Sequence, residues 1–370
     1  MIRIDEIYNN TFWPWADQNL PLTRLFFCDP PGRSDPDSLY NHGHDVDELH
    51  YIFFHDQEPI HLDIHRDLFK EVTDRNRTLD KGNGPVKAAF ITSEFESDMA
   101  ERMCRRYQWT HFNYFFHGWA SLDWYRGYDK TFLITPADQR QINKTFIAPN
   151  RIIAGKRLHR LNMLYHIFKN NMTNNWISCP AVCPVENISI VDAAKPLIST
   201  YPDIQDVFAA QQLPIDFPNE SGHPMHSCWL SLFDQAADSL LYLVTETVAE
   251  GRRWHLTEKT FKPIAMGMPF VLVATQGSLK YLRNYGFKTF EGIWDESYDL
   301  EPDDTKRIER IASLLKSLDE LTIQGKRDLF EMALPVIQHN WDHFYNGGFE
   351  AVLWTELQGM LARLHQYIND

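Results

Sequence analysis

The stretch from residue 254 to residue 274 constrains the fold more than any other part of the chain. Thr257 can cap a helix, and apolar residues recur at helical spacing from Phe261 to Ala265. Gly267 can end that helix in a left-handed conformation. The apolar run of residues 270–274 follows at once and is typical of a buried parallel strand. A helix that leads directly into such a strand predicts an α/β protein.

The rest of the chain alternates short apolar runs with helical patterns, which favours parallel sheets covered by helices. We expect strands at residues 25–28, 49–54, 86–92, 110–116, 131–134, 146–147 and 239–244. We expect helices at residues 64–72, 97–107, 156–171, 278–285, 305–318, 326–339 and 349–368. Residues 29–47 and 174–224 show few clear periods and are predicted to be mostly loop.

Composition limits the class of protein. A chain of 370 residues that is 44% hydrophobic can form two ordinary domains with substantial cores. No apolar run approaches the length of a membrane span. Five sparse cysteines favour a reducing compartment, and thus a cytoplasmic protein, and they are poor evidence for zinc. A net charge of −14 argues against a general nucleic-acid coat but allows a local basic cleft.

The sequence from Thr257 onward, Thr-Glu-Lys followed by a Gly-x-Pro-hydrophobic run, resembles the donor-site motif of two-Rossmann (GT-B) sugar-nucleotide glycosyltransferases. The fucosyltransferase-like branch and many phage and marine-virus glycosyltransferases are most similar. In those families the residue at Glu258 holds the nucleotide ribose, and the residue at Lys259 lies near the diphosphate.

The resemblance implies two Rossmann-like domains with a cleft between them. The first, residues 1–145, would supply the acceptor side and the base, and the second, residues 146–350, would bind the nucleotide sugar. The C-terminal helix, residues 351–370, would pack back on the first domain.

A basic cluster, Lys156, Arg157 and Arg160, opens one predicted helix. Cations at a helix N-terminus oppose the helix dipole, so they are unfavourable there unless they bind an anion. The cluster also resembles the Arg-containing segment that grips the donor diphosphate in fucosyltransferase-like enzymes. Together with Thr257, Glu258 and Lys259 it forms the predicted donor site, which requires neither a metal nor a cofactor. No Walker A phosphate loop is present in the sequence.

Candidates for the base follow predicted strands of the first domain. Asp56 and Glu58 come directly after one apolar strand, where a carboxylate could deprotonate an acceptor hydroxyl. A simple turn is an equally good interpretation of these two residues. Ser93 and Glu94 occupy a similar place, although helix capping explains them better.

An aromatic segment follows the strand that is predicted to end at Phe116. His117 is an alternative base. Trp119, Trp124 and Tyr125 could form a stacking platform for a sugar or a base of the acceptor. Aromatic core packing is the competing interpretation.

Two further acidic patterns are weaker evidence for a functional site. The Asp-x-Asp pairs at residues 35–37 and 45–47 lie before a strand, beside His42 and His44, and favour a solvated loop over a metal site. The run at residues 295–299, Asp-Glu-Ser-Tyr-Asp, resembles the viral glycosyltransferases and is interpreted as a turn that leads into a helix.

The predicted reaction is transfer of a hexosyl or pentosyl group from a nucleotide sugar to an acceptor hydroxyl, by an inverting, metal-independent route. The acceptor could be a glycan, a small molecule or modified DNA. Two alternatives stay open: a phage enzyme that glycosylates hydroxymethylated DNA bases, and a non-catalytic nucleotide- or sugar-binding module.

Overall fold

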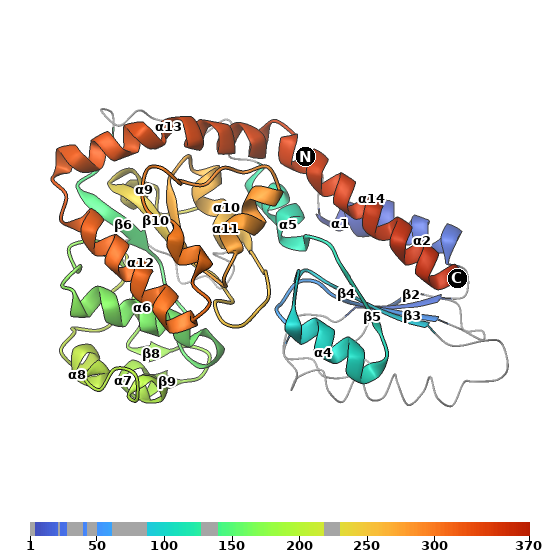
Figure 1. The fold of residues 1–370 in the computed structure, drawn as a ribbon, viewed down its shortest axis with the longest axis horizontal. Helices are drawn as coiled ribbons and strands as arrows, with labels where there is room; N and C mark the ends of the chain where they lie inside the picture. Colours follow the sequence, from blue (N-terminus) through green and yellow to red (C-terminus); the bar gives the residue numbers. More distant parts are fainter. Residues whose placement is uncertain are drawn as a thin grey trace. The chain divides into compact units, whose positions relative to one another are not determined.

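The computed structural model describes residues 4–20, 23–27, 40–42, 50–60, 87–126, 140–217 and 230–370. The chain divides into two compact units. The first unit comprises Met1–Asp123, Arg252–His255 and Glu350–Asp370, and the second comprises Trp124–Gly251 and Leu256–Phe349. Each unit is built on a sheet that is wholly or mainly parallel, so the α/β class is confirmed (Figure 1).

The sheet of the first unit has five strands in the order β2 (Tyr40–His42), β1 (Thr23–Phe27), β3 (His50–His55), β4 (Lys87–Thr92) and β5 (Thr110–Asn113). Strands β1, β3, β4 and β5 are parallel, and β2 runs antiparallel to β1. Four predicted strands are therefore confirmed. The prediction of loop throughout residues 29–47 is wrong at β2, because three polar residues there pair with the edge of β1.

Helices cover both faces of this sheet. On one face, Phe53 and Phe90 pack with Met103 of α4 (Asp98–Tyr107) in a single buried cluster. Ser97 caps α4 as predicted, because its hydroxyl accepts from the Ala100 amide at 3.2 Å. Side chains alternate along a strand, so Phe54 faces the opposite way and meets Phe12 edge to face, with ring centroids 5.1 Å apart.

Phe12 belongs to an N-terminal helical segment made of α1 (Ile4–Ile7), the π-helix η1 (Tyr8–Phe12) and α2 (Trp13–Asn19). The last helix, α14 (Gly348–Asn369), also contributes to this unit. Its Tyr367 packs on Phe112 and donates to the carbonyl of Ala88 at 3.2 Å.

The segment after β5 differs from the prediction. The strand ends at Asn113 and not at Phe116 as predicted, and helix α5 (Phe116–Tyr125), which we did not predict, begins at Phe116. Trp119 is completely buried against Trp354 of α14, with ring centroids 4.8 Å apart, and Tyr125 is also completely buried. The prediction that these two rings form an exposed stacking platform is therefore wrong, since each ring is completely buried. Trp124 is half-buried.

The sheet of the second unit is wholly parallel, in the order β11 (Phe270–Val273), β10 (Ser239–Thr245), β6 (Lys144–Ala148) and β7 (Trp176–Ile177). From β6 the chain passes through α6 (Leu158–Lys169) to β7 on one side. It then returns to the other side of β6 at β10 and passes through α10 (Glu258–Ala265) to β11. The direction of strand addition thus reverses between β6 and β10.

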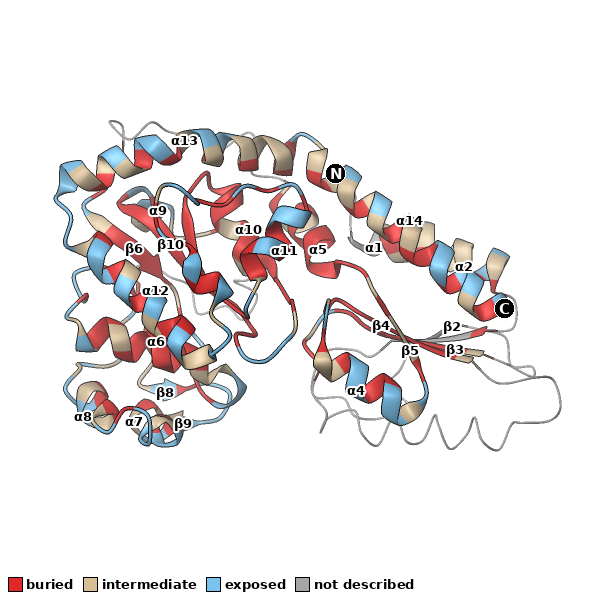
Figure 2. Cartoon of the chain, viewed as in Figure 1, coloured by how far each residue is buried: buried red, intermediate tan, exposed pale blue. Residues whose placement is uncertain are grey.

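Because right-handed crossovers that run in opposite directions place their helices on opposite faces, α6 and α10 cover different faces of the sheet. Helix α12 (Asp304–Asp319) packs beside α6, and α13 (Ile323–Tyr345) packs beside α10. The short helices α9 (Phe233–Ala237) and α11 (Ser278–Asn284) precede β10 and follow β11. In Figure 2 the buried residues of the long helices form continuous stripes.

Residues 174–217 are mostly loop, as predicted, and contain several short elements. They form β8 (Val182–Cys183), β9 (Ile188–Ser189), α7 (Ile190–Ala193), the 3-10 turn η5 (Lys195–Leu197) and α8 (Ile204–Ala209). Phe208 of α8 packs edge to face on Phe168 of α6. Elements of two to six residues are too short to show a period, so the sequence did not predict them, although most of this segment lies outside helices and strands as expected.

Several predictions fall outside the described residues. These are the helix at 64–72, the strand at 131–134, and the acidic and histidine residues at positions 35, 37, 44, 45 and 47.

We expect Trp119→Ala to lower the free energy of unfolding by about 3–5 kcal/mol, because it removes a large, fully buried side chain. Chemical denaturation followed by circular dichroism measures this. Met332→Ala, at an exposed apolar residue of α13, is the control and should change stability little. Equal effects of the two substitutions would contradict the burial of Trp119.

Candidate functional site

The carboxyl ends of β6 and β10 form the edge at which the strand order of the second unit reverses. Such a switch point is where open α/β sheets bind ligands. The two strand ends are joined there, because Thr245 donates its hydroxyl proton to Asn150 Oδ1 at 3.0 Å. Polar side chains are thus held at the place where the topology predicts a ligand.

Arg160 of α6 also stabilises this edge, because it donates hydrogen bonds to a residue that follows β6 and to the end of β10. Its Nη1 donates to the Ile152 carbonyl at 3.0 Å, and its Nη2 donates to the carbonyls of Thr245 and Glu246, both at 3.1 Å. The side chain is buried, and its Nε has no hydrogen-bond partner among the described residues. The prediction that Arg160 grips a diphosphate directly therefore needs correction, since both terminal nitrogens are committed to backbone carbonyls.

The charges that shift the pKa of Arg160 identify the predicted site residues that lie near it. Burial, and then the positive charge of Arg157, lower the pKa of Arg160 to about 10. The charges of Glu246 and Glu258 oppose that shift. Residues from the start of α6, the end of β10 and the start of α10 thus lie within electrostatic reach of one another in the second unit.

Helix α10 begins as the sequence predicts. Thr257 is the N-cap, and its hydroxyl accepts from the Lys259 amide at 3.4 Å. Gly267 has a φ of +62°, the left-handed conformation expected after the helix. A cation and a carboxylate pair at this start, because Lys259 Nζ lies 2.8 Å from Glu258 Oε1, and the same Nζ donates to Thr247 Oγ1 at 3.2 Å. Glu258 is buried, whereas the side chain of Lys259 is 31% exposed.

Glu246, which the sequence analysis missed, fills the N-terminal end of α10. Its Oε1 accepts from the Thr257 amide at 2.9 Å and the Thr260 hydroxyl at 2.6 Å. Its Oε2 accepts from the Thr257 hydroxyl at 2.6 Å and the Thr247 amide at 3.1 Å. The expectation that this helix end offers open amides to an anionic ligand is therefore wrong. The signal was a lone carboxylate that closes a mostly apolar run, Leu240–Val244 followed by Thr245.

The start of α6 differs from that of α10 in its capping and in its charged residues. The 3-10 turn η4 (Gly155–Arg157) precedes it, so Lys156 and Arg157 lie before the α-helix and not in its first turn as predicted. Arg157 is the N-cap residue, with no side-chain capping bond, and the first turn contains no acidic residue. Lys156 is exposed and Arg157 is half-buried.

His159, in the first turn of α6, was also missed. The ring is buried, and its Nε2 lies 2.8 Å from the Glu246 carbonyl. Burial, followed by the charge of Arg160, lowers the pKa of His159 to about 3, so the imidazole is neutral at physiological pH. The Nε2 must then carry the proton that the carbonyl accepts, which leaves Nδ1 as a buried acceptor without a partner among the described residues.

The helices that follow β10 and β11 have carboxylates at their starts, and α6 does not. Glu246 serves α10, and Asp299 serves α11 by accepting from the amides of Leu279 at 3.0 Å and Lys280 at 3.4 Å. Gly277 is the N-cap of α11, and the Ser278 hydroxyl donates to the Thr275 carbonyl and does not cap the helix. The run at residues 295–299 therefore has the structural role that we inferred for it.

One acidic side chain does approach the turn before α6. Gly155 has a φ of +59°, and a Cβ at that position would lie 2.5 Å from Glu186 Oε1. Glu186 also accepts from the Cys183 thiol at 2.8 Å. A side chain on residue 155 would be strained at this φ and would displace the Glu186 carboxylate, so the turn favours glycine.

The candidate bases of the first unit have different environments. Asp56, at the end of β3, is buried, and burial raises the pKa of its carboxyl although the phenols of Tyr8 and Tyr114 oppose that shift. Glu58, two residues later, is half-buried.

His117 lies on α5, buried, with its ring edge to face on His255 at a centroid distance of 5.1 Å. Ser93 Oγ lies 3.4 Å from His255 Nδ1. Glu94 is occupied structurally, because it accepts from the Ile60 amide at 2.7 Å and pairs with Arg253 at 3.2 Å. Glu94 does not cap a helix itself, because Ser97 caps α4 and donates its hydroxyl proton to Glu94.

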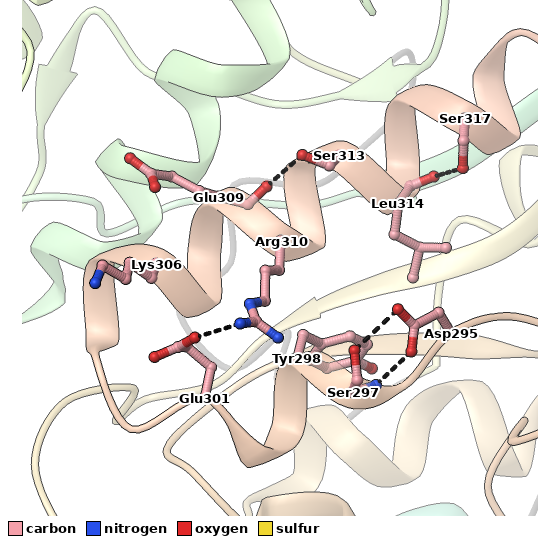
Figure 3. Close-up of a pocket in the computed structure, with 10 residues that line it drawn as sticks. All are labelled: Asp295, Ser297, Tyr298, Glu301, Lys306, Glu309, Arg310, Ser313, Leu314 and Ser317. Atoms are coloured by element: carbon pink, nitrogen blue, oxygen red, sulfur yellow. Dashed lines mark hydrogen bonds and ion pairs between the residues drawn. The ribbon is translucent and has the colours of Figure 1, made fainter.

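A cavity of about 660 Å³ lies elsewhere in the second unit, between α12 and the 3-10 turn η7 (Ser297–Leu300). Figure 3 shows that four of its polar side chains pair with one another: Arg310 reaches Glu301 at 2.8 Å, and Ser297 donates to Asp295 at 2.9 Å. Because these groups are already satisfied, we place the candidate site at the switch point and not in this cavity.

No group of three or more metal-ligating side chains is found within the part of the chain that the structure describes. None of its described helices is both long and apolar enough to cross a membrane. No protein-family model, curated protein or solved structure matches the chain.

We expect Glu246→Ala to destabilise the second unit by at least about 2 kcal/mol, because it leaves two threonine hydroxyls and an amide buried without their acceptor. Thermal unfolding measures the loss. Glu320→Ala, at an exposed glutamate after α12, should have little effect. Similar midpoints for the two variants would show that Glu246 does not hold the start of α10.

Proposed function

We propose that this protein is a glycosyltransferase that transfers a sugar from a nucleotide sugar to an acceptor hydroxyl. The observation that carries the proposal is the start of α6 at the switch point. It has no side-chain cap, it is preceded by Arg157, and it lies within electrostatic reach of Glu258. An uncapped helix start surrounded by cations is suited to bind an anion such as a diphosphate.

The roles within the second unit follow from which groups are already occupied. Arg157 and Lys156 would bind the diphosphate, because Arg160 is committed to backbone carbonyls and acts by fixing the edge. Glu258 would accept hydrogen bonds from the ribose, as the resemblance implies. Lys259, paired with Glu258 and partly exposed, would neutralise charge on the departing diphosphate. Cations in these positions make a metal unnecessary for this step.

In a two-Rossmann arrangement the first unit would supply the acceptor chemistry. A base must reach the acceptor hydroxyl. Asp56 and His117 are buried, whereas Glu58 is partly exposed, so we assign the base to Glu58. A base that is separate from the donor site fits direct, inverting transfer.

Donor binding is tested by thermal unfolding in a panel of nucleoside diphosphates and nucleotide sugars. We expect one nucleoside diphosphate to raise the midpoint of the wild-type protein. Arg157→Ala and Glu258→Gln should each weaken its binding about 10-fold or more, since charge-assisted hydrogen bonds contribute about 1.5–3 kcal/mol. Arg105→Ala, at an exposed arginine of α4, is the matched control. Retention of full affinity in both site variants would rule out this donor site.

Turnover is tested by release of the nucleoside diphosphate with glycans, small hydroxyl compounds or hydroxymethylated DNA as acceptors. We expect Glu58→Gln to lower kcat by about 100-fold or more while donor affinity is kept, because general-base catalysis contributes about 10²–10⁴-fold. Glu320→Gln should behave as wild type. Donor binding without turnover on any acceptor would favour the non-catalytic binding module.

A further inference from the structure

Three oxygen atoms meet in a closed triangle at the carboxyl edge of the first unit. Tyr8 Oη lies 2.5 Å from Asp56 Oδ2, Tyr114 Oη lies 2.6 Å from the same Oδ2, and the two phenol oxygens are 2.7 Å apart. The three side chains come from the π-helix η1, the end of β3 and the residue after β5. Every side of the triangle therefore has the length of a hydrogen bond.

The number of protons decides how such a triangle is held together. Each O–O contact of this length needs one hydrogen between its oxygens, so three sides need three hydrogens. Each phenol has one hydrogen to donate, and an ionised carboxylate has none. With Asp56 ionised, both phenols would donate to Oδ2, and two phenol oxygens would face each other at 2.7 Å with no hydrogen between them. With Asp56 protonated on Oδ2, each hydroxyl donates to the next around the ring.

The surroundings also favour the neutral form. Asp56 is 2% exposed and Tyr114 is 1% exposed, so water does not solvate a charge there. Among the described residues, the groups that act on the Asp56 carboxyl are the phenols of Tyr8 and Tyr114 and its own backbone amide, and no described cation is among them. Its neighbour on β3, His55, directs Nε2 to the Pro59 carbonyl at 3.4 Å. The buried Glu94 differs in this respect, because Arg253 pairs with it.

We propose that Asp56 is a neutral carboxylic acid at physiological pH and closes a three-hydrogen ring with Tyr8 and Tyr114. Such an acid donates a hydrogen bond or a proton and cannot accept the proton of an acceptor hydroxyl. Tyr8 is the partly exposed member of the ring and is therefore the point at which its proton exchanges with solvent. The inference does not depend on the proposed function, although it supports Glu58 over Asp56 as the base.

The test is the infrared spectrum of the intact protein at neutral pH, compared with that of Asp56→Asn. We expect the wild-type protein to show the carbonyl stretch of a protonated carboxyl group that is missing from the variant. Asp206→Asn, at an exposed aspartate of α8, should remove an ionised carboxylate band instead. Loss of a carboxylate band in Asp56→Asn would overturn the proposal. Other buried acids cancel in these difference spectra.

A second measurement does not rely on spectroscopy. The fold raises the pKa of Asp56 above the ordinary value of 3.8, so its proton stabilises the folded state fully below about pH 3.8. That contribution is lost as the pH rises from there toward the raised pKa. The unfolding midpoint of the wild type should therefore fall relative to that of Asp56→Asn across this range. A relative midpoint that stays constant or rises would show that Asp56 is ionised in the fold.

Discussion

The second unit depends on the buried junction at the end of β10. The Glu246 carboxylate receives four hydrogen bonds, three of them from the first residues around α10. The carbonyl of the same residue accepts from Arg160 and contacts His159, both on α6. One residue thus ties together the central strand and the two helices that cover opposite faces of the sheet. Neither helix can move at this edge without breaking buried hydrogen bonds.

This junction decides which helix start can receive a ligand. Since Glu246 neutralises the start of α10 and Asp299 that of α11, an external anion has little to gain at either. The start of α6 has no such partner from its own first turn, and Arg157 precedes it. The positive end of the dipole and the cation therefore act in the same direction at the switch point. This asymmetry is the physical basis of the proposed donor site.

The first unit uses buried acids in two different ways. Glu94 is balanced by Arg253 and by hydrogen bonds from Ser97 and the Ile60 amide, and so it fixes the loop after β4. In the described part of the chain Asp56 has two phenols and no cation as partners, an environment that favours its neutral form. A carboxylate at the end of a strand is therefore not by itself evidence for a base. The hydrogens available around it determine whether it can accept a proton.

The sequence by itself determined the elements whose signal is local. The cap at Thr257, the left-handed Gly267 and the strand at Phe270 each follow from the conformational preference of one residue or a short apolar run, and all are present in the structure. Only the tertiary structure decided what those elements contact. Glu246 lies 11 residues before Thr257, and Tyr8 lies 48 residues before Asp56, so no local period could reveal either partner. Burial and hydrogen-bond satisfaction are properties of the packed unit, and they placed a carboxylate at the start of α10 and two phenols beside the carboxyl group of Asp56.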